Sequence, residues 1–416
     1  MPKGCKKRMI VHARVVVTMD GAPIENGAVA ISGDRIIDVE KFDQIKTRNS
    51  GPLIDLGERV LLPGLINAHC HLDYTCLRGK IRRQESFTDW IRAINSEKAK
   101  LGPEDYVASI TEGFSEAKRF GTTTIVNLTA FPELIREFPT TPIRTWWCAE
   151  LIDVRSPNRT PHVLDSVLES LRYAQDYGLA PHALFTASKN LYLRCQEAEA
   201  NVLLTTHLAE SREEMEMFRD GSGRLYDFMK SIGRPMGDCG QETPLMRFMN
   251  AEGFSTARNS NRWLVAHLNE LSESDFISLE RMRTKFHVVH SPRSREYFDH
   301  SPFQYKRLHA LGFNVCLGTD SLASNENLSL FAEMRAFQRT APESSPERIF
   351  EMVTVNPASA LGQPDSLGRI RSGFRADLVA IPYSDSGDLF GHIVAFDGDT
   401  DWVMVKGRTR TKSVGD

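Results

Sequence analysis

His69 and His71 are two metal-capable side chains separated by one residue, and they follow the mostly apolar stretch Leu65–Ala68. Side chains alternate along a β-strand, so a strand here places both imidazoles on one face and points Cys70 away. Two imidazoles on one face make half of a metal site. A pair of hydrogen-bonded surface histidines is the alternative. Cys70 fits a small packed hydrophobic residue better than a ligand.

Three further polar residues stand at the ends of short apolar stretches, namely His207, His267 and Asp320. Each alone fits a core polar residue with hydrogen-bond partners, because an unpartnered buried polar group is costly. Together with the histidine pair they indicate one metal site. Glu210 lies three residues beyond His207, from where its carboxyl group could reach a metal-bound water without ligating the metal.

The elements that must position these residues read as alternating short strands and amphipathic helices. Eight strand candidates precede helical stretches, and β-then-α alternation repeated eight times predicts an α/β chain folded as a (β/α)8 TIM barrel. A doubly wound sheet is the competing fold, but no GxGxxG motif stands at a strand-to-helix turn. The candidates are Leu65–His71, Thr122–Leu128, Ile143–Leu151, Leu179–Ala187, Leu203–Glu210, Trp263–Leu268, His287–Pro292 and Val315–Asp320.

Both ends of the chain have a different pattern, with short β-branched or alternating stretches around turn residues. They predict one small β-sandwich domain built from residues 1–63 and 365–416. The catalytic barrel is then expected over residues 64–364. In such barrels the functional side chains lie at the carboxyl ends of the strands, where the polar residues above recur.

Composition excludes several classes of protein. The 416 residues carry a net charge of -3, which argues against nucleic acid as a partner. No apolar run approaches the roughly 18 residues of a membrane helix, so no membrane partner is expected. The seven cysteines form no CxxC pair, so a disulfide framework is not expected. No secretory signal is found, so a cytoplasmic location is expected. A small-molecule substrate is the expected partner, and a homo-oligomer stays open.

The segment Pro63–His71 resembles the PGxxNxHxH signature of the amidohydrolase superfamily. The later His207, His267 and Asp320 motifs follow in the same order as in that superfamily. Two further stretches resemble its C-terminal part: Asn356–Ala358 followed by Leu361–Gly362, and Gly368–Asp377. The resemblance covers nearly the whole chain and implies a barrel hydrolase that depends on a metal.

The resemblance also bears on the number of metal ions. Dinuclear members carry a carboxylated lysine on strand four, but Leu179–Ala187 has no lysine and Lys189 lies just beyond it. One divalent metal per chain is therefore favoured. Zn²⁺ is the default and Fe²⁺ is the alternative, because imidazole suits both. The implied metal ligands are His69, His71, His207 and Asp320.

The mononuclear arrangement resembles the adenosine and cytosine deaminases, which implies three catalytic residues. Glu210 is the implied proton shuttle between the metal-bound water and the substrate ring. His267 is expected to hold and polarise that water, and Asp320 to accept a proton from the nucleophile. A metal-bound hydroxide then attacks a ring carbon, and ammonia leaves.

A finer resemblance points to the branch with S-adenosylhomocysteine, 5′-methylthioadenosine and aminofutalosine deaminases and triazine hydrolases. Thr75–Gly79 with Trp90–Ile91 resembles its TxLRG…WL segment. Ala180–Thr186 resembles its PHAPYT segment, except at Leu184 and Phe185. His182 in that segment is the expected substrate contact, although a core histidine bonded to backbone is an equal alternative. Glu97 is expected where that branch has a ribose-binding glutamate.

Two more groups could recognise the substrate. Arg293 or Arg295 could bind a substrate carboxylate by paired hydrogen bonds, although either could be a solvated loop charge. Trp146 or Trp147 could stack on a purine, although neighbours on a strand point opposite ways and at least one is expected to pack against a barrel helix.

The implied activity is hydrolytic deamination of an adenine-bearing nucleoside or a related aminated heterocycle. The alternative is a hydrolase of the same fold that acts on a C–N or C–Cl bond of a cyclic amide, guanidine or triazine. A catalytically inactive relative is a third hypothesis, but it predicts lost metal ligands, and all of them are present. Glu210 favours release of ammonia over release of chloride, because some dechlorinating relatives lack this shuttle.

Overall fold

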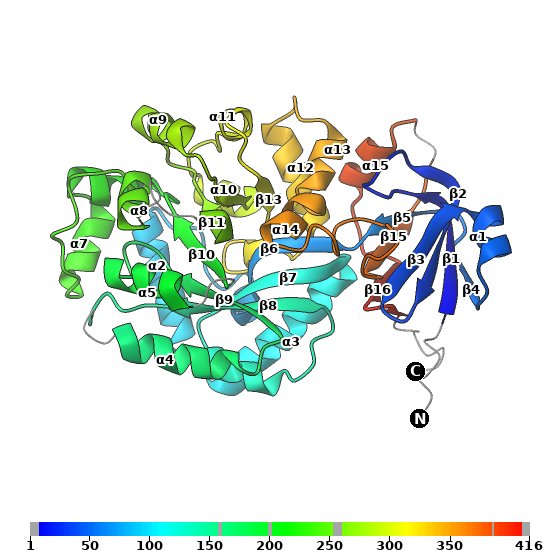
Figure 1. The fold of residues 1–416 in the computed structure, drawn as a ribbon. Helices are drawn as coiled ribbons and strands as arrows, with labels where there is room; N and C mark the ends of the chain where they lie inside the picture. Colours follow the sequence, from blue (N-terminus) through cyan, green and yellow to red (C-terminus); the bar gives the residue numbers. More distant parts are fainter. Residues whose placement is uncertain (1–7, 157–159, 199–201, 253–259, 385–386, 410–416) are drawn as a thin grey trace.

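The computed structural model describes residues 8–156, 160–198, 202–252, 260–384 and 387–409. It contains a sheet of nine strands and a sheet of eight strands, which lie side by side (Figure 1). We call the first the barrel sheet and the second the terminal sheet. Cys5 lies outside the described residues, and the six described cysteines form no disulfide with one another.

The barrel sheet is parallel throughout and runs in the order β13-β12-β11-β10-β9-β8-β7-β6-β14. Only Gly318 and Thr319 separate β13 from β14 along the chain. β13 pairs with β12, and β14 pairs with β6, so the two ends of the path meet. This arrangement fits the predicted TIM-like barrel, with β13 and β14 as one interrupted eighth strand. The strands are β6 (Leu65–His71), β7 (Thr122–Thr129), β8 (Arg144–Leu151), β9 (Asp176–Pro181), β10 (Leu203–Leu208), β11 (Trp263–His267), β12 (His287–His290), β13 (Val315–Leu317) and β14 (Asp320–Ser321).

Strand four differs most from its predicted bounds. The prediction was Leu179–Ala187, but β9 ends at Pro181, and the chain then turns through Ala183, whose carbonyl accepts hydrogen bonds from the backbone N–H groups of Thr186 and Ala187. The apolar residues after Pro181 are buried in this turn, which made them look like a strand. β9 has no lysine, and Lys189 is the exposed first residue of the next helix, as expected.

Helices alternate with the strands of the barrel sheet and surround it (Figure 1). In α3, residues Tyr106, Ile110, Phe114 and Ala117 recur every three or four positions, so they form one buried face. The helices between the strands are α2 (Phe87–Lys98), α3 (Pro103–Arg119), α4 (Thr160–Leu171), α5 (Lys189–Ala198), α6 (Arg212–Met215), α7 (Arg224–Ser231), α8 (Pro244–Glu252), α9 (Glu273–Arg281), α10 (Pro292–Phe298) and α11 (Tyr305–Ala310), with α12 (Leu330–Thr340), α13 (Pro346–Glu351) and α14 (Val355–Ala360) after β14. Short helical turns also occur at Leu72–Leu77, Pro132–Glu137, Glu216–Asp220 and Ser260–Arg262.

The terminal sheet takes strands from both ends of the chain, as predicted, in the order β17-β16-β15-β5-β1-β2-β3, with β4 on β1. β5 pairs with β1 on one side and with β15 on the other. The finer description as a sandwich, and the domain boundaries at residues 63/64 and 364/365, stay predictions. The elements are β1 (Arg8–Val16), β2 (Ile24–Ser32), β3 (Arg35–Lys41), α1 (Phe42–Arg48), β4 (Leu53–Asp55), β5 (Arg59–Pro63), β15 (Leu378–Pro382), α15 (Leu389–Ala395), β16 (Trp402–Val405) and β17 (Arg408–Thr409).

Buried Asp377 joins the two sheets. Its carboxylate pairs with Arg144 of β8 and accepts a hydrogen bond from the backbone N–H of Lys406 at 2.6 Å. Its carbonyl oxygen accepts a 2.8 Å hydrogen bond from the backbone N–H of Gly64, directly before β6. The strand that carries His69 and His71 is thereby fixed where it leaves the terminal sheet.

The core places the two tryptophans on opposite sides of β8, as strand alternation requires. Trp146 packs inside the barrel with Ile66, Val126 and other strand side chains. Trp147 packs outward against Phe114 of α3, with ring centroids 5.8 Å apart. The helix-packing prediction is therefore confirmed for Trp147. No helix among the described residues is both long and apolar enough to cross a membrane.

Candidate functional site

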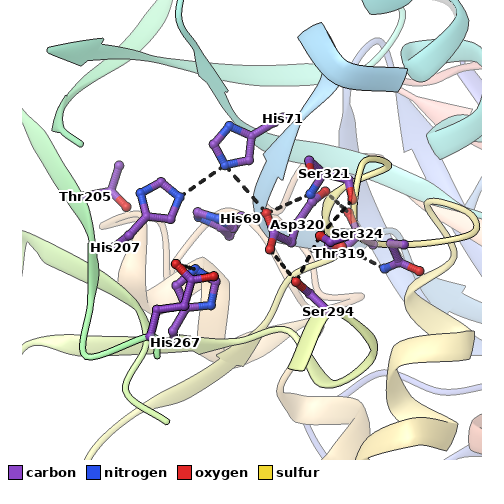
Figure 2. A network of polar contacts seen from close by, with 12 residues as sticks. His69, His71, Thr205, His207, His267, Ser294, Thr319, Asp320, Ser321 and Ser324 are labelled. Atoms are coloured by element: carbon purple, nitrogen blue, oxygen red, sulfur yellow. Dashed lines mark hydrogen bonds and ion pairs between the residues drawn. The ribbon is translucent and has the colours of Figure 1, made fainter. Parts of the chain in front are cut away.

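Four barrel strands bring His69, His71, His207, His267 and Asp320 together at their carboxyl ends (Figure 2). We call these five residues the histidine–aspartate cluster. His71 Nε2 lies 3.2 Å from His207 Nε2 and 3.7 Å from Asp320 Oδ1. His69 Nε2 lies 3.7 Å from the same Asp320 oxygen. The sequence motifs, which span some 250 residues of chain, thus converge on one point, as the barrel fold predicts.

Buried nitrogen atoms without partners test whether a metal ion fits the cluster. Neither ring nitrogen of His69, nor Nδ1 of His71, has a hydrogen-bond partner among the described residues. Ligand atoms of His69, His71 and His207 lie within 4.8 Å of one another, and so do those of His69, His267 and Asp320. Facing imidazoles buried without partners are unfavourable, whereas a divalent cation among them would bind their lone pairs. The residues therefore fit a metal ion.

His71 and His207 are held in the neutral form that metals bind. Burial lowers the pKa of His207 to about 4, with the charge of His69 acting in the same direction. Burial and the charges of His69 and His207 also lower the pKa of His71 well below its usual value. His207 Nδ1 lies 2.8 Å from the carbonyl oxygen of His182, so Nδ1 carries the hydrogen and Nε2 presents its lone pair to the cluster.

Asp320 is kept ionised and fixed in direction. Burial acts to raise its pKa, but the neighbouring His69, His267 and His71 outweigh burial and hold the pKa well below the usual range. Ser294 Oγ donates a 2.7 Å hydrogen bond to Asp320 Oδ2, and the backbone N–H of Ser321 donates a 2.7 Å bond to Oδ1 (Figure 2). Asp320 also has a φ of +56°, a left-handed conformation that side chains other than glycine rarely adopt.

The break in the eighth strand explains how that conformation is held. Gly318 passes so close to β6 that a Cβ atom there would lie 2.7 Å from the carbonyl oxygen of His69. The backbone N–H of Thr319 donates to that same oxygen at 3.0 Å, and Asn67 Nδ2 donates to Thr319 Oγ1 at 2.8 Å. Two adjacent strands thus lock Asp320 beside His69.

Glu210 lies at the edge of the cluster, beyond the end of β10. Its Oε2 is 3.7 Å from His267 Nε2, and its Oε1 is 3.9 Å from His300 Nε2. Burial, then the charges of Asp320 and Glu214, raise the pKa of Glu210 well above its usual value. The carboxyl group can therefore carry a proton near neutral pH. The cluster can thus combine a divalent cation with an adjacent acid–base group.

A cavity of about 880 Å³ opens on the cluster. Its inner wall includes His71, His207, Glu210, His267 and Asp320, and its outer wall is largely apolar side chains of α2, α4 and α7. The volume is ample for a nucleoside-sized molecule. His182 also lines the cavity, and its Nδ1 lies 2.7 Å from Thr186 Oγ1.

The structure does not bring the other predicted substrate contacts to the described lining of this cavity. Glu97 is paired with Lys100 at 2.6 Å. The Arg293 guanidinium donates to Asn327 Oδ1 and to Glu326 Oε2, each at 2.8 Å. Arg295 donates to the carbonyl oxygen of His300 at 2.8 Å. Neither Trp146 nor Trp147 is part of the described lining, because both pack into the core.

Sequence reasoning missed several polar residues at the site. Glu150 is the second-last residue of β8 and lines the cavity, and burial raises the pKa of its carboxyl to about 7. Lys98 lines the cavity from α2. Ser294 donates a hydrogen bond to Asp320, and His300 lies 3.9 Å from Glu210. For Glu150 the signal was available, since it stands at the carboxyl end of a predicted strand, as the cluster residues do.

Comparison with known proteins agrees with this geometry. Residues 60–410 match the pattern described as "Amidohydrolase family". The chain belongs to the amidohydrolase family. A family member from Syntrophobacter fumaroxidans, named 5-methylthioadenosine/S-adenosylhomocysteine deaminase, is 30% identical over 89% of this chain and 83% of its own length. The 5'-deoxyadenosine deaminase of Methanocaldococcus jannaschii is 27% identical over 91% of this chain and 89% of its own.

Solved structures share the amidohydrolase fold along nearly the whole chain. Helicobacter pylori aminofutalosine deaminase, solved with methylthio-coformycin, superimposes with a TM-score of 0.83 at 18% identity over 97% of this chain and 100% of its own. A zinc-bound adenosine deaminase from Xanthomonas campestris gives a TM-score of 0.78 at 21% identity over 99% of this chain and 94% of its own. These likenesses establish the fold.

Proposed function

We propose that this amidohydrolase is a metal-dependent hydrolytic deaminase of an adenine-bearing nucleoside, and that it releases ammonia. The observation that carries the proposal is the position of Glu210, a buried carboxyl with a raised pKa, beside a cluster of buried histidines and the ionised Asp320. The deaminase names of the relatives support the same reaction. Their names also support a nucleoside as the substrate class.

His69, His71, His207 and Asp320 would hold one divalent cation, with Zn²⁺ as the proposed ion. Nitrogen and carboxylate ligands suit zinc, and one similar structure contains it. When bound, the cation would lower the pKa of water to about 7 and so supply a hydroxide nucleophile near neutral pH.

Glu210 moves the protons. In its ionised form it would accept one proton from the nucleophilic water and deliver that proton to the substrate ring nitrogen. His267 orients the water, since its Nε2 lies 3.7 Å from Glu210 and within the cluster. Asp320 would accept the remaining proton of the nucleophile, and Glu210 would pass this second proton to the amino group, which leaves as ammonia when the C–N bond breaks.

His182 is the proposed substrate contact. Its ring lines the cavity next to His207, with the two ring centroids 4.8 Å apart. A hydrogen bond with Thr186 fixes the ring direction. The apolar outer wall of the cavity would then cover the part of the nucleoside that is remote from the reacting carbon.

Ammonia release by the zinc-loaded enzyme tests the proposal. The panel would contain adenosine, 5′-deoxyadenosine, methylthioadenosine, S-adenosylhomocysteine and aminofutalosine, with guanine, cytosine and an amino-triazine beside them. Turnover of at least one adenine nucleoside is expected. If the metal-loaded protein released no ammonia from any of these nucleosides but hydrolysed a cyclic amide or a chlorotriazine, the proposal would be wrong. The protein would then be a hydrolase of another C–N or C–Cl bond.

A further inference from the structure

Glu150 is a buried carboxyl group to which the proposed reaction gives no task. It lies at the carboxyl end of β8 with a side chain only 4% exposed. Its Oε1 has no hydrogen-bond partner among the described residues. That oxygen lies 3.8 Å from His71 Nδ1 and 3.8 Å from His182 Nε2. A carboxyl oxygen buried without a partner is costly, so its position calls for a physical reason.

The two ring nitrogen atoms of His71 explain the position of Glu150. Nε2 faces the cluster, 3.2 Å from His207 Nε2 and 3.7 Å from Asp320 Oδ1. Nδ1 is on the other side of the ring, is buried, and also lacks a partner among the described residues. A histidine that binds a metal through one nitrogen usually donates the other N–H to a carboxylate or a carbonyl. Glu150 Oε1 is the carboxylate oxygen that faces this N–H.

A second metal ion is the competing explanation, because ligand atoms of Glu150, His182 and His207 also lie within 4.8 Å of one another. His207 excludes it. Its Nδ1 carries a hydrogen directed at the carbonyl oxygen of His182, so Nε2 has the one available lone pair. That lone pair already points to the first cluster, next to His71. One lone pair cannot bind two cations. Without His207, a second metal ion would have two ligands, Glu150 and His182.

We propose that Glu150 is a positioning residue that accepts the Nδ1–H of His71 and thereby fixes this metal ligand. The 3.8 Å separation exceeds an N–H···O hydrogen bond by about 0.9 Å. The two groups must therefore approach each other when the cation binds. The inference rests on the proposed metal-dependent function, which supplies the cation.

Metal affinity tests the role directly. Competition with a chelator of known affinity would give the zinc dissociation constant of wild type, Glu150→Ala and Glu150→Gln. Loss of such an outer-sphere partner weakens metal binding by about 10-fold to 100-fold, which is the expected loss for Glu150→Ala. Glu150→Gln keeps an acceptor oxygen and is expected to lose less. The visible absorption of the cobalt-substituted protein should also change, because it reports ligand geometry.

Glu116→Gln is the matched control, since Glu116 is another buried glutamate but pairs with Arg78 and the backbone N–H of Leu328. Its zinc affinity and cobalt spectrum should equal those of wild type. Wild-type affinity in Glu150→Ala, an equal loss in Glu116→Gln, or two zinc ions per wild-type chain would overturn the role. If Glu150→Ala fails to fold, an unchanged affinity in the nearly isosteric Glu150→Gln overturns it. A wild-type protein that binds no metal would instead refute the proposed function.

Discussion

Glu210 Oε2 lies 3.7 Å from Nε2 of His267, and both side chains are buried at the edge of the histidine–aspartate cluster. Glu210 follows β10, and His267 ends the neighbouring strand β11. The backbone is left-handed at Ala209, next to Glu210, and at His267 itself. Ala209 has a φ of +49°, and His267 has a φ of +77°. Strained backbone of this kind persists where the surrounding structure holds it, commonly at functional sites.

Replacing Glu210 by Gln should remove the proton transfer and leave the metal in place. General acid–base groups contribute about 10²-fold to 10⁴-fold to rate, so kcat should fall by at least that range. Glu210 is not a member of the potential ligand groups, so zinc content should stay at the wild-type value. Ammonia release and elemental analysis measure the two quantities. Undiminished turnover in this variant would remove Glu210 from the mechanism.

Replacing Asp320 by Asn should weaken metal binding as well as activity. The amide keeps the shape of the carboxylate and can still accept the hydrogen bond from Ser294, but it loses the negative charge that faces three imidazoles. Zinc affinity should fall by more than about tenfold, since even outer-sphere partners account for that much. Chelator competition gives the affinity. A variant that kept wild-type affinity but lost turnover would show that Asp320 is not a ligand.

Gly318→Ala should disturb the cluster without removing any of its polar side chains. The new Cβ would lie 2.7 Å from the carbonyl oxygen and 2.8 Å from the Cβ of His69, so β6 and β13 would have to separate. Overpacking of this kind costs about 1–3 kcal/mol, and zinc affinity should fall with stability. Gly237→Ala is the control, because no atom lies within 4 Å of its added Cβ. Urea unfolding should show a lower stability, and metal titration a lower zinc affinity, for Gly318→Ala than for Gly237→Ala. Equal values for the two variants would contradict the close approach of Gly318 to His69.

Glu333 predicts a pH dependence of stability. Burial raises the pKa of this carboxyl from 4.5 to about 7, although it accepts hydrogen bonds from Asn325 and from the backbone N–H of Arg293. The folded state therefore binds a proton more tightly than the unfolded state. The resulting stability is complete below pH 4.5 and is lost as pH rises through 7.

Glu333→Gln removes this titration. Relative to wild type, the metal-free variant should gain up to about 3 kcal/mol between pH 5 and pH 8, from 1.36 kcal/mol per pKa unit. Urea unfolding of both proteins at the two pH values measures the difference. A difference between the two proteins that did not change with pH would show that Glu333 has an ordinary pKa in the folded protein.

The sequence predicted those parts of the fold and site that depend on local period and position along a strand. His69, His71, His207, His267 and Asp320 each lie near the carboxyl end of a predicted strand, and parallel strands of a barrel must end at one rim. Glu150 lies near the end of a strand in the same way, but no motif singled it out. Its closeness to His71 depends on how β6, β7 and β8 lie side by side, which local pattern does not reveal.

Residues outside the strands could not be placed in this way. Glu97 lies on α2, and the direction of a helical side chain depends on the length and path of the preceding loop. Arg293 lies in the first turn of α10, but its guanidinium donates hydrogen bonds to Glu326 and Asn327 in the loop after β14. Such pairings join segments that sequence reading treats separately, so a loop arginine cannot be assigned to substrate or to structure from its type alone.

The pairing of β5 with β15 has a consequence for how the chain is made. β5 precedes the whole barrel sheet, whereas its antiparallel neighbour β15 follows it. During translation one edge of β5 therefore remains without its neighbour until residues 378–382 leave the ribosome. Unpaired strand edges are templates for association with other chains. We expect nascent chains that stop before β15 to depend on chaperones, and the docking of the last strands to be a late step in folding.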